Sequence, residues 1–198
     1  MKKLIFIIVT FVLLGNNTIT AQEKIVGISL GYPVNLTDHW LVGGWNNKIN
    51  VNAKFSRNYN LLTVGVGLNY SACEVDYWFR YYQSDNKSIS DLSSYILVGL
   101  NFNKNKFSII PHTNIGYSFI FSNIEIYRGS GGLYVAPGFD INYAFFDNIR
   151  IGMNVNYNLI FAELDCNTDG WIVHCDFFRE TDEIMKSVIF GVNIGYIF

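Results

Sequence analysis

From residue 24 onward, large apolar residues alternate with small polar residues, with a period of two, along almost the whole chain. This period is typical of β-strands, whose successive side chains point to opposite faces. The pattern predicts an all-β protein. The eight predicted strands cover residues 24–34, 48–57, 60–78, 92–103, 106–127, 132–145, 148–164 and 184–198.

The side chains on the two faces of these strands differ in size and polarity more than in charge. One face is almost entirely large and apolar, as at Val64, Val66 and Leu68, while the other is mostly Gly, Asn, Ser, Thr and Ala. A soluble β-protein would carry Lys and Glu on its outer face, yet only 15% of this chain is charged. Small uncharged side chains instead fit the narrow interior of an eight-stranded barrel, so the apolar face is predicted to meet lipid. A soluble β-domain with the apolar face as its core is the structural alternative.

Short and long connections also alternate along the chain. This is typical of a membrane barrel, which has short turns on one side and long loops on the other. The predicted fold is therefore an eight-stranded antiparallel up-and-down transmembrane β-barrel. The short connections are 57–60, 103–106 and 146–148, and the longer ones are 35–47, 79–91, 126–132 and 165–183.

The beginning of the chain is typical of a secretory signal peptide. Lys2 and Lys3 precede an apolar run over 4–14, which is too short to span a bilayer and is followed by a small-residue cleavage site. No continuous apolar run of transmembrane-helix length follows it. We therefore expect a signal peptide, 1–21, and one barrel domain, 22–198.

Three charges fall on inward strand positions, namely Lys54, Asp140 and Arg150. They could line a narrow pore, or they could form a buried ionic network that plugs the lumen, since buried charges need partners. An eight-stranded barrel is just wide enough to be filled by side chains, which favours the plug. The net charge of −2 argues against a nucleic-acid partner.

Three cysteines leave the disulfide pattern open. Cys166 and Cys175 lie in the last long loop and are the favoured pair in an exported protein, although Cys73 could compete as a partner. The same loop contains His174, but the spacing of its Cys and His residues matches no familiar zinc pattern. No metal site and no cofactor are predicted.

A catalytic site is also not predicted. His112 is inward by parity and has Ser108 and Ser118 on the same strand face, which is the beginning of a nucleophilic arrangement. No partner acid is evident, so a hydrogen-bonded interior histidine is the favoured interpretation.

The end of the chain carries a further signal, because Val192, Ile194, Tyr196 and the final Phe198 alternate outward. With the strand pattern and aromatic residues near both edges, the chain resembles the small bacterial outer-membrane barrels of the OmpA/OmpX type. The resemblance covers nearly all of 22–198. It implies insertion into outer-membrane lipid by the barrel assembly machinery, which reads the C-terminal strand.

The resemblance does not imply one activity, because a fold hosts many functions. We expect an exported monomer with a non-enzymatic role, either structural or in surface interaction with an unknown ligand through its long loops. A narrow passive channel is the alternative, and an enzyme that modifies lipid A is a more remote one.

Overall fold

A computed structural model of the chain describes residues 23–36, 45–75, 88–122, 127–128, 130–163, 165–166 and 182–198. The predicted signal peptide lies outside these residues. Within the part described, no helix is long and apolar enough to cross a membrane.

Eight long strands make up the described structure: β1 (Lys24–Asn35), β2 (Trp45–Tyr59), β3 (Leu62–Val75), β4 (Ser88–Leu100), β6 (Phe107–Ser122), β8 (Ser130–Phe146), β9 (Ile149–Glu163) and β11 (Asp182–Ile197). Three short strands accompany them: β5 (Phe102–Lys104), β7 (Tyr127–Arg128) and β10 (Asp165–Cys166). The last two pair with each other outside the main sheet.

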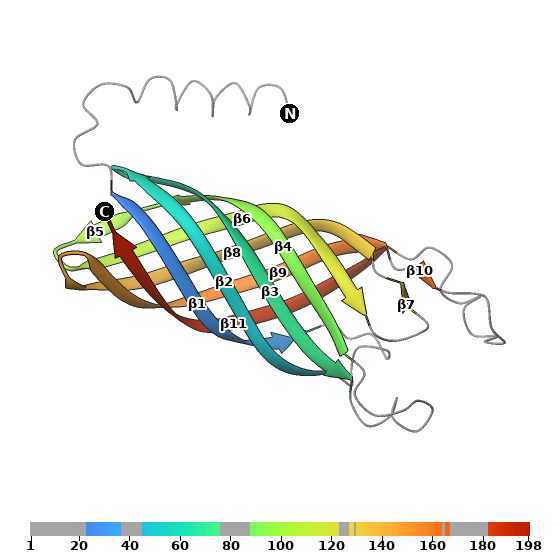
Figure 1. Cartoon of the computed structure of the whole chain (residues 1–198). Coiled ribbons are helices and arrows are strands. Elements are labelled where there is room, and N and C mark those ends of the chain that lie inside the picture. The colour runs from blue at the N-terminus through green and yellow to red at the C-terminus, as the bar shows by residue number, and fades with distance from the viewer. Residues whose placement is uncertain are drawn as a thin grey trace, which may run out of the picture.

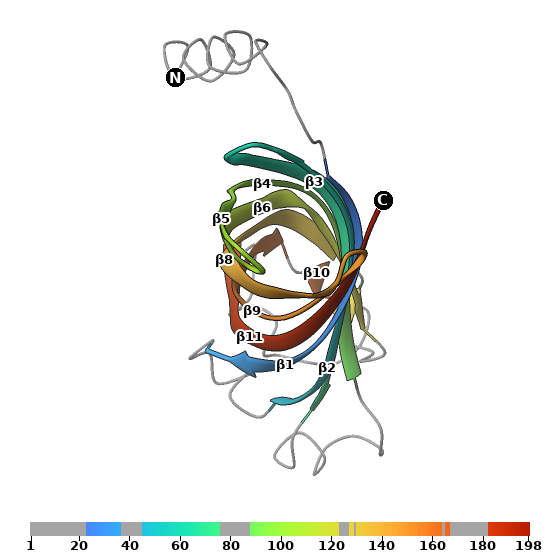
Figure 2. The ribbon, with the colours of Figure 1, turned by 90° about the vertical axis from the view of Figure 1, so that its left-hand side faces the viewer.

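The long strands form one closed antiparallel sheet (Figures 1 and 2). Each strand pairs with its sequence neighbour among the long strands, β1 pairs with β11, and β4 pairs with β6. The prediction of an eight-stranded antiparallel up-and-down barrel is therefore confirmed.

The register shows how steeply the strands are tilted. Following paired residues from Gly27 through β2, β3, β4, β6, β8 and β9 leads to Met185 in β11. The direct partner of Gly27 in β11 is Gly195, so the two routes differ by ten positions (195 less 185). Such a stagger accompanies strands tilted by about 35–45° to the barrel axis.

The three short connections are two-residue turns at one end of the barrel. They lie between pairs that are still in register, Tyr59 with Leu62, Lys104 with Phe107 and Phe146 with Ile149. Asn60 and Asn105 have φ of 51° and 57°, a conformation that asparagine tolerates better than most residues. At each turn the preceding strand ends, and the following strand begins, one or two residues later than the sequence predicts.

One predicted strand is corrected in the structure. The strand predicted over 92–103 begins at Ser88 and breaks after Leu100 into β4 and β5. At the break, the backbone N–H of Asn101 donates to the backbone carbonyl of Leu61 at 2.6 Å instead of continuing the pairing with β6. The earlier start places Asp91 inside a strand, where the sequence predicts a loop.

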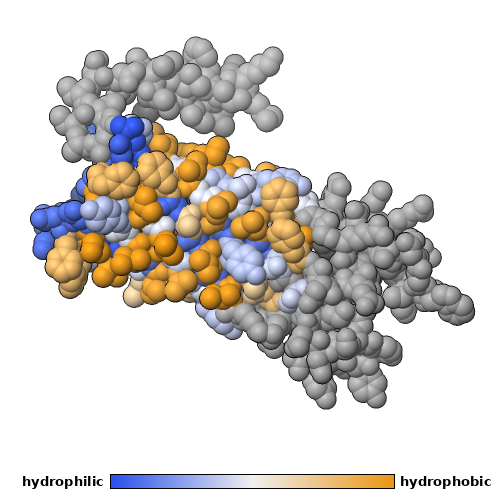
Figure 3. Space-filling view, in the orientation of Figure 1, coloured by the Kyte–Doolittle hydropathy of each residue, from blue (hydrophilic) through white to orange (hydrophobic). Residues whose placement is uncertain are grey.

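The predicted division into two faces holds around the barrel. Outward residues are large, apolar and exposed, as Ile96 (61%) and Met153 (67%) show, whereas the inward Ser93 is fully buried. Hydrophobic residues accordingly predominate along the visible side of the barrel, and hydrophilic residues gather at the short-turn end (Figure 3).

The interior also holds bulky side chains that the simple pattern does not predict. Tyr95, Tyr134 and Ile189 all point inward and are almost completely buried. Glycines on neighbouring strands make room for them: a Cβ added at Gly67 would collide with the Tyr95 ring, and one at Gly31 would lie 2.6 Å from Ile189 Cγ2. Large and small residues thus complement each other across the lumen.

Gly116 and Gly27 provide a matched test of this packing. A Cβ at Gly116 would overlap the backbone carbonyl of Ser94, whereas at Gly27 the nearest atom is 3.5 Å away. Because backbone cannot easily move aside, Gly116→Ala should destabilise the folded barrel by about 1–3 kcal/mol. Gly27→Ala should change stability by less than about 0.5 kcal/mol. Urea titration of the refolded barrel measures both values, and equal effects would contradict this account of the interior.

Candidate functional site

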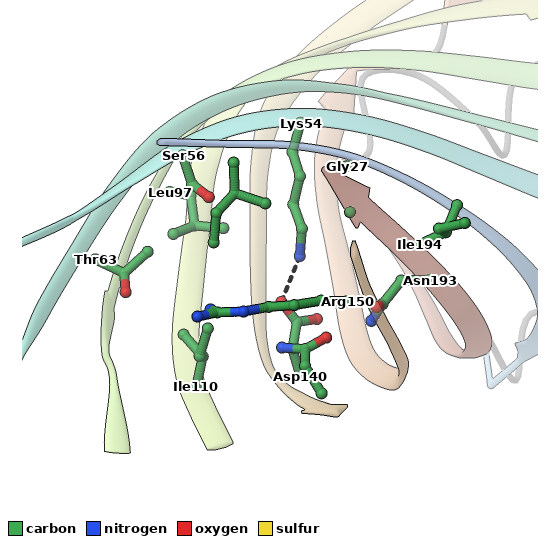
Figure 4. Close-up of a pocket in the computed structure, with 13 residues that line it drawn as sticks. Gly27, Lys54, Ser56, Thr63, Leu97, Ile110, Asp140, Arg150, Asn193 and Ile194 are labelled. Carbon is green, nitrogen blue, oxygen red and sulfur yellow. Dashed lines mark hydrogen bonds and ion pairs between the residues drawn. The ribbon is translucent and has the colours of Figure 1, made fainter. Parts of the chain in front are cut away.

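The lumen near the short-turn end is crossed by an ion pair between Lys54 and Asp140 (Figure 4). Lys54 comes from β2 and Asp140 from β8, which lie four strands apart in either direction around the barrel. The bond therefore spans the lumen. Both side chains are largely buried, so each charge depends on the other for compensation.

A second ion pair lies closer to the end of the barrel. Arg150 Nη2 donates to Glu23 Oε2 at 2.6 Å, and Glu23 also accepts from Asn58 Nδ2 at 3.2 Å. The sequence pattern misses Glu23. This residue precedes the first predicted strand, so the alternation assigns it to neither face. Arg150 faces Ala144 in the register with β8, so the structure shows no pairing of Arg150 with Asp140.

A small cavity lies beside Lys54 and Asp140 of the first pair and Arg150 of the second. Its volume is about 30 Å³, and its lining includes Lys54, Asp140, Arg150 and Asn193. Asp140 Oδ1, Arg150 Nη1 and Asn193 Nδ2 are buried and have no hydrogen-bond partner among the described protein atoms. A space of this size is large enough for at least one water molecule, which such polar atoms would bind.

Farther from the short turns, asparagine and tyrosine side chains fill the lumen. Tyr95 Oη donates to Asn52 Oδ1 at 2.8 Å, and Tyr134 Oη donates to Asn158 Oδ1 at 3.2 Å. The two rings also contact each other, with centroids 6.0 Å apart. These contacts reach across the interior and leave it packed.

Asp91 is a fourth inward charge. It lies in β4, is buried, and accepts a long hydrogen bond of 3.4 Å from Ser93 Oγ. The prediction that Lys54, Asp140 and Arg150 are the only inward charges is therefore wrong. The polar sequence at the start of β4 hides the strand and, with it, this position.

His112 is buried in the lumen wall. Its ring nitrogens lie 3.1 Å from the Ile110 carbonyl oxygen and 3.0 Å from Asn156 Oδ1. Neither Ser108 nor Ser118 is a partner of the ring, although all three residues are buried on the inward face. The histidine thus makes interior hydrogen bonds rather than a contact with a serine nucleophile.

The cysteine-rich loop is only partly described. Cys73 lies in β3 and Cys166 in β10, while His174 and Cys175 fall outside the described residues. The Cys166–Cys175 disulfide therefore stays a prediction. Within the described ranges, no group of three or more His, Cys, Asp or Glu side chains could hold a metal ion.

The four C-terminal residues with the predicted assembly signal all point outward. Val192, Ile194, Tyr196 and Phe198 are each more than half exposed. The Phe198 ring lies 6.3 Å from Tyr196 and 6.4 Å from Phe55 of β2, so aromatic residues gather where the barrel closes between β1 and β11.

Comparison with known proteins finds similarity in structure alone. No family model matches the chain, and no curated protein matches it. Solved structures do match. A major outer membrane protein from Thermus thermophilus has a TM-score of 0.60 at 11% identity, covering 90% of this chain and 100% of that one.

Two further structures are similar to nearly the same extent. Neisserial surface protein A matches with a TM-score of 0.55 at 12% identity, over 90% of this chain and 98% of that one. Ail, the attachment invasion locus protein of Yersinia pestis, solved in complex with the heparin analogue sucrose octasulfate, matches with a TM-score of 0.55 at 14% identity, over 90% and 100%. At such identities the likeness concerns the fold, and this chain has the fold of the small bacterial outer-membrane β-barrels.

Proposed function

We propose that this chain is an integral protein of the bacterial outer membrane whose filled barrel supports long surface loops. Its role is structural or in surface interaction, without catalysis. The observation that carries this proposal is the lumen-spanning ion pair between Lys54 and Asp140, set among packed polar side chains.

The outward face supports the location in a membrane. Large apolar side chains such as Leu30, Phe119 and Val192 are each more than half exposed on the barrel wall. An apolar surface that surrounds a protein is unfavourable in water and is suited to lipid. Many inward polar residues bind one another inside the barrel, as Tyr95 with Asn52 and Tyr134 with Asn158 show.

The filled lumen supports a closed barrel over the alternative of a narrow channel. The cavity beside Asp140 and Arg150 is small, about 30 Å³, and the Lys54–Asp140 ion pair crosses the lumen next to it. Ions crossing this region would have to displace two ion pairs, and each displaced partner would be left as a buried charge.

The long connections support a role at the surface. They join the strands at the end opposite the two-residue turns and run over residues 36–44, 76–87, 123–129 and 164–181. Loops on a rigid scaffold commonly carry function. The fold is compatible with attachment, since one protein that shares it is named for attachment and invasion.

The contacts of His112 favour a non-enzymatic role over modification of lipid A. Its ring is engaged by Asn156 and the Ile110 carbonyl, and neither nearby serine contacts it. A serine nucleophile needs a base within hydrogen-bond reach.

Insertion by the barrel assembly machinery is part of the proposal. The alternating outward residues Val192, Ile194, Tyr196 and Phe198 form an exposed apolar edge on the strand that closes the barrel. This arrangement is what recognition of the C-terminal strand would require.

Single-channel recording in a planar bilayer tests whether the lumen is closed. The unaltered protein should give no stable conductance steps, because the ion pairs obstruct the lumen. Replacing Lys54, Asp140 and Arg150 by serine, together with Tyr95 and Tyr134 by serine, removes both the charged and the aromatic obstruction and should produce steps. The control, Lys104→Ser with Lys106→Ser, removes exposed turn charges and should stay silent. Stable steps from the unaltered protein would instead support the channel.

Replacement of residues 167–181 by a short Gly-Ser linker tests the role of the loops. We expect the shortened protein to remain in the outer-membrane fraction and to keep a gel mobility that changes on boiling, since the described strand pairs of the barrel do not include these residues. Cells that carry it should lose surface attachment while keeping resistance to detergent. Loss of detergent resistance, with attachment unchanged, would contradict the surface role and favour a structural one.

A further inference from the structure

Two cations face each other on the outer wall at the short-turn end of the barrel. Lys24 of β1 and Arg57 of β2 are direct partners in the antiparallel register. Both side chains point outward, because each residue is flanked in its strand by a buried inward neighbour, Ile25 for Lys24 and Ser56 for Arg57. The structure thus places two positive charges side by side on the outward face.

Like charges directly opposite each other across two strands are unfavourable unless an anion lies between them. Within the described residues neither Lys24 nor Arg57 forms an ion pair. The nearest acidic residue in sequence, Glu23, binds Arg150 and Asn58 instead. Arg57 Nε is buried and has no hydrogen-bond partner among these residues. Within the described residues, no Asp or Glu side chain therefore neutralises the pair.

Aromatic rings hold both cations in place. Lys24 Nζ lies 6.0 Å from the centre of the Phe198 ring, and Arg57 Cζ lies 5.1 Å from the centre of the Tyr59 ring. Contacts of this kind orient a cation without neutralising it. The guanidinium and the ammonium thus keep their charges on two residues that are direct partners in the register.

The surface next to the pair is apolar. The next outward pair along the same two strands is Val26 with Phe55, and both side chains are exposed. In a membrane this boundary between cations and apolar side chains lies at the level of the lipid headgroups. A lipid whose anionic headgroup bound the two cations would place its acyl chains over Val26 and Phe55.

We propose that Lys24 and Arg57 together bind the phosphate of one anionic phospholipid, of the phosphatidylglycerol class, in the leaflet at the short-turn end. Arginine binds phosphate through two parallel hydrogen bonds, and lysine adds a point charge beside it. This inference rests on the proposed membrane location and adds a specific lipid site to it.

Native mass spectrometry of the folded protein in detergent tests the site directly. Phosphatidylglycerol should bind as one saturable adduct, more tightly than phosphatidylcholine, whose quaternary ammonium neutralises its phosphate. Inorganic phosphate should not compete at millimolar concentration, because it lacks acyl chains. Lys24→Gln with Arg57→Gln should weaken the phosphatidylglycerol adduct by about 25-fold, since the loss of each cation weakens binding by about fivefold.

The control variant is Lys104→Gln with Lys106→Gln, which removes two exposed cations from the turn at the same end. It should leave the adduct within about twofold of the unaltered protein. Equal binding of the two lipids would overturn the proposal. An equal loss in both double variants would also overturn it, since this would show general attraction to a basic rim. Competition by inorganic phosphate would show that the pair binds a free anion rather than a lipid.

Thermal unfolding of the single variant Lys24→Gln gives a second readout that does not depend on the double variant folding. In phosphatidylcholine vesicles the unfolding midpoint should rise or stay unchanged, because the repulsion from Arg57 is relieved. In vesicles containing phosphatidylglycerol the midpoint should fall relative to the unaltered protein. A shift in the same direction in both lipids would indicate a purely structural role and overturn the site.

Flotation of the same vesicles separates this proposal from the one on which it rests. If the unaltered protein floats with the vesicles but shows no preference for phosphatidylglycerol, only the lipid site is wrong. If it fails to associate with vesicles of either composition, the membrane location is wrong as well.

Discussion

The closed ladder of backbone hydrogen bonds is the constraint on which the rest of this structure depends. Eight tilted strands pair with two neighbours each, and the pairing of β4 with β6 completes the circle. In a membrane no water is present to satisfy an unpaired strand edge, so closure is what allows a sheet to lie in lipid. Once the sheet is closed, its alternating side chains have only two environments, the surrounding solvent and a narrow lumen.

The small diameter of the barrel explains what fills the lumen. Asparagine, serine and glycine occupy most inward positions, and the larger Tyr95 and Tyr134 fit because glycines stand beside them. Charged residues are accommodated as pairs, as Lys54 with Asp140 shows. The ion pair is best understood as a consequence of burial. Removing one partner of such a pair would destabilise the fold by more than the intact pair stabilises it, because the other charge would remain buried alone. A filled interior is in turn what makes the barrel a rigid support for its loops.

Much of this fold can be predicted from the sequence, because it depends on local alternation. A large apolar residue such as Val64 next to a small residue such as Gly65 is a local feature of the sequence. This alternation assigns the outward and inward faces without any tertiary information. The three short turns are located to within a few residues for the same reason. The C-terminal pattern that ends at Phe198 indicates the family of folds, which the similarity of solved structures confirms.

The remaining features depend on long-range pairing. Glu23 precedes the first strand, so only the closed barrel reveals that it reaches Arg150, which lies 127 residues away in sequence. The sequence pattern assigns Asp91 to a loop because the serine-rich start of β4 lacks apolar alternation, and pairing with β3 is what extends the strand. The lumen charges can be placed inward from parity, but which of them meet depends on the stagger between strands, which a sequence does not show.

The most direct test of this account measures which environment the outward face meets. Nitroxide labels would be placed at Phe190, Val192 and Ile194 of β11, with one at the inward Asn193, after the native cysteines are replaced by serine and the protein is folded into vesicles. The account predicts that the three outward labels are strongly relaxed by oxygen, which concentrates in lipid, and weakly by a water-soluble nickel complex. The label at Asn193 should be shielded from oxygen. Outward labels shielded from both reagents would contradict the account, because Phe190, Val192 and Ile194 would then form the core of a soluble protein.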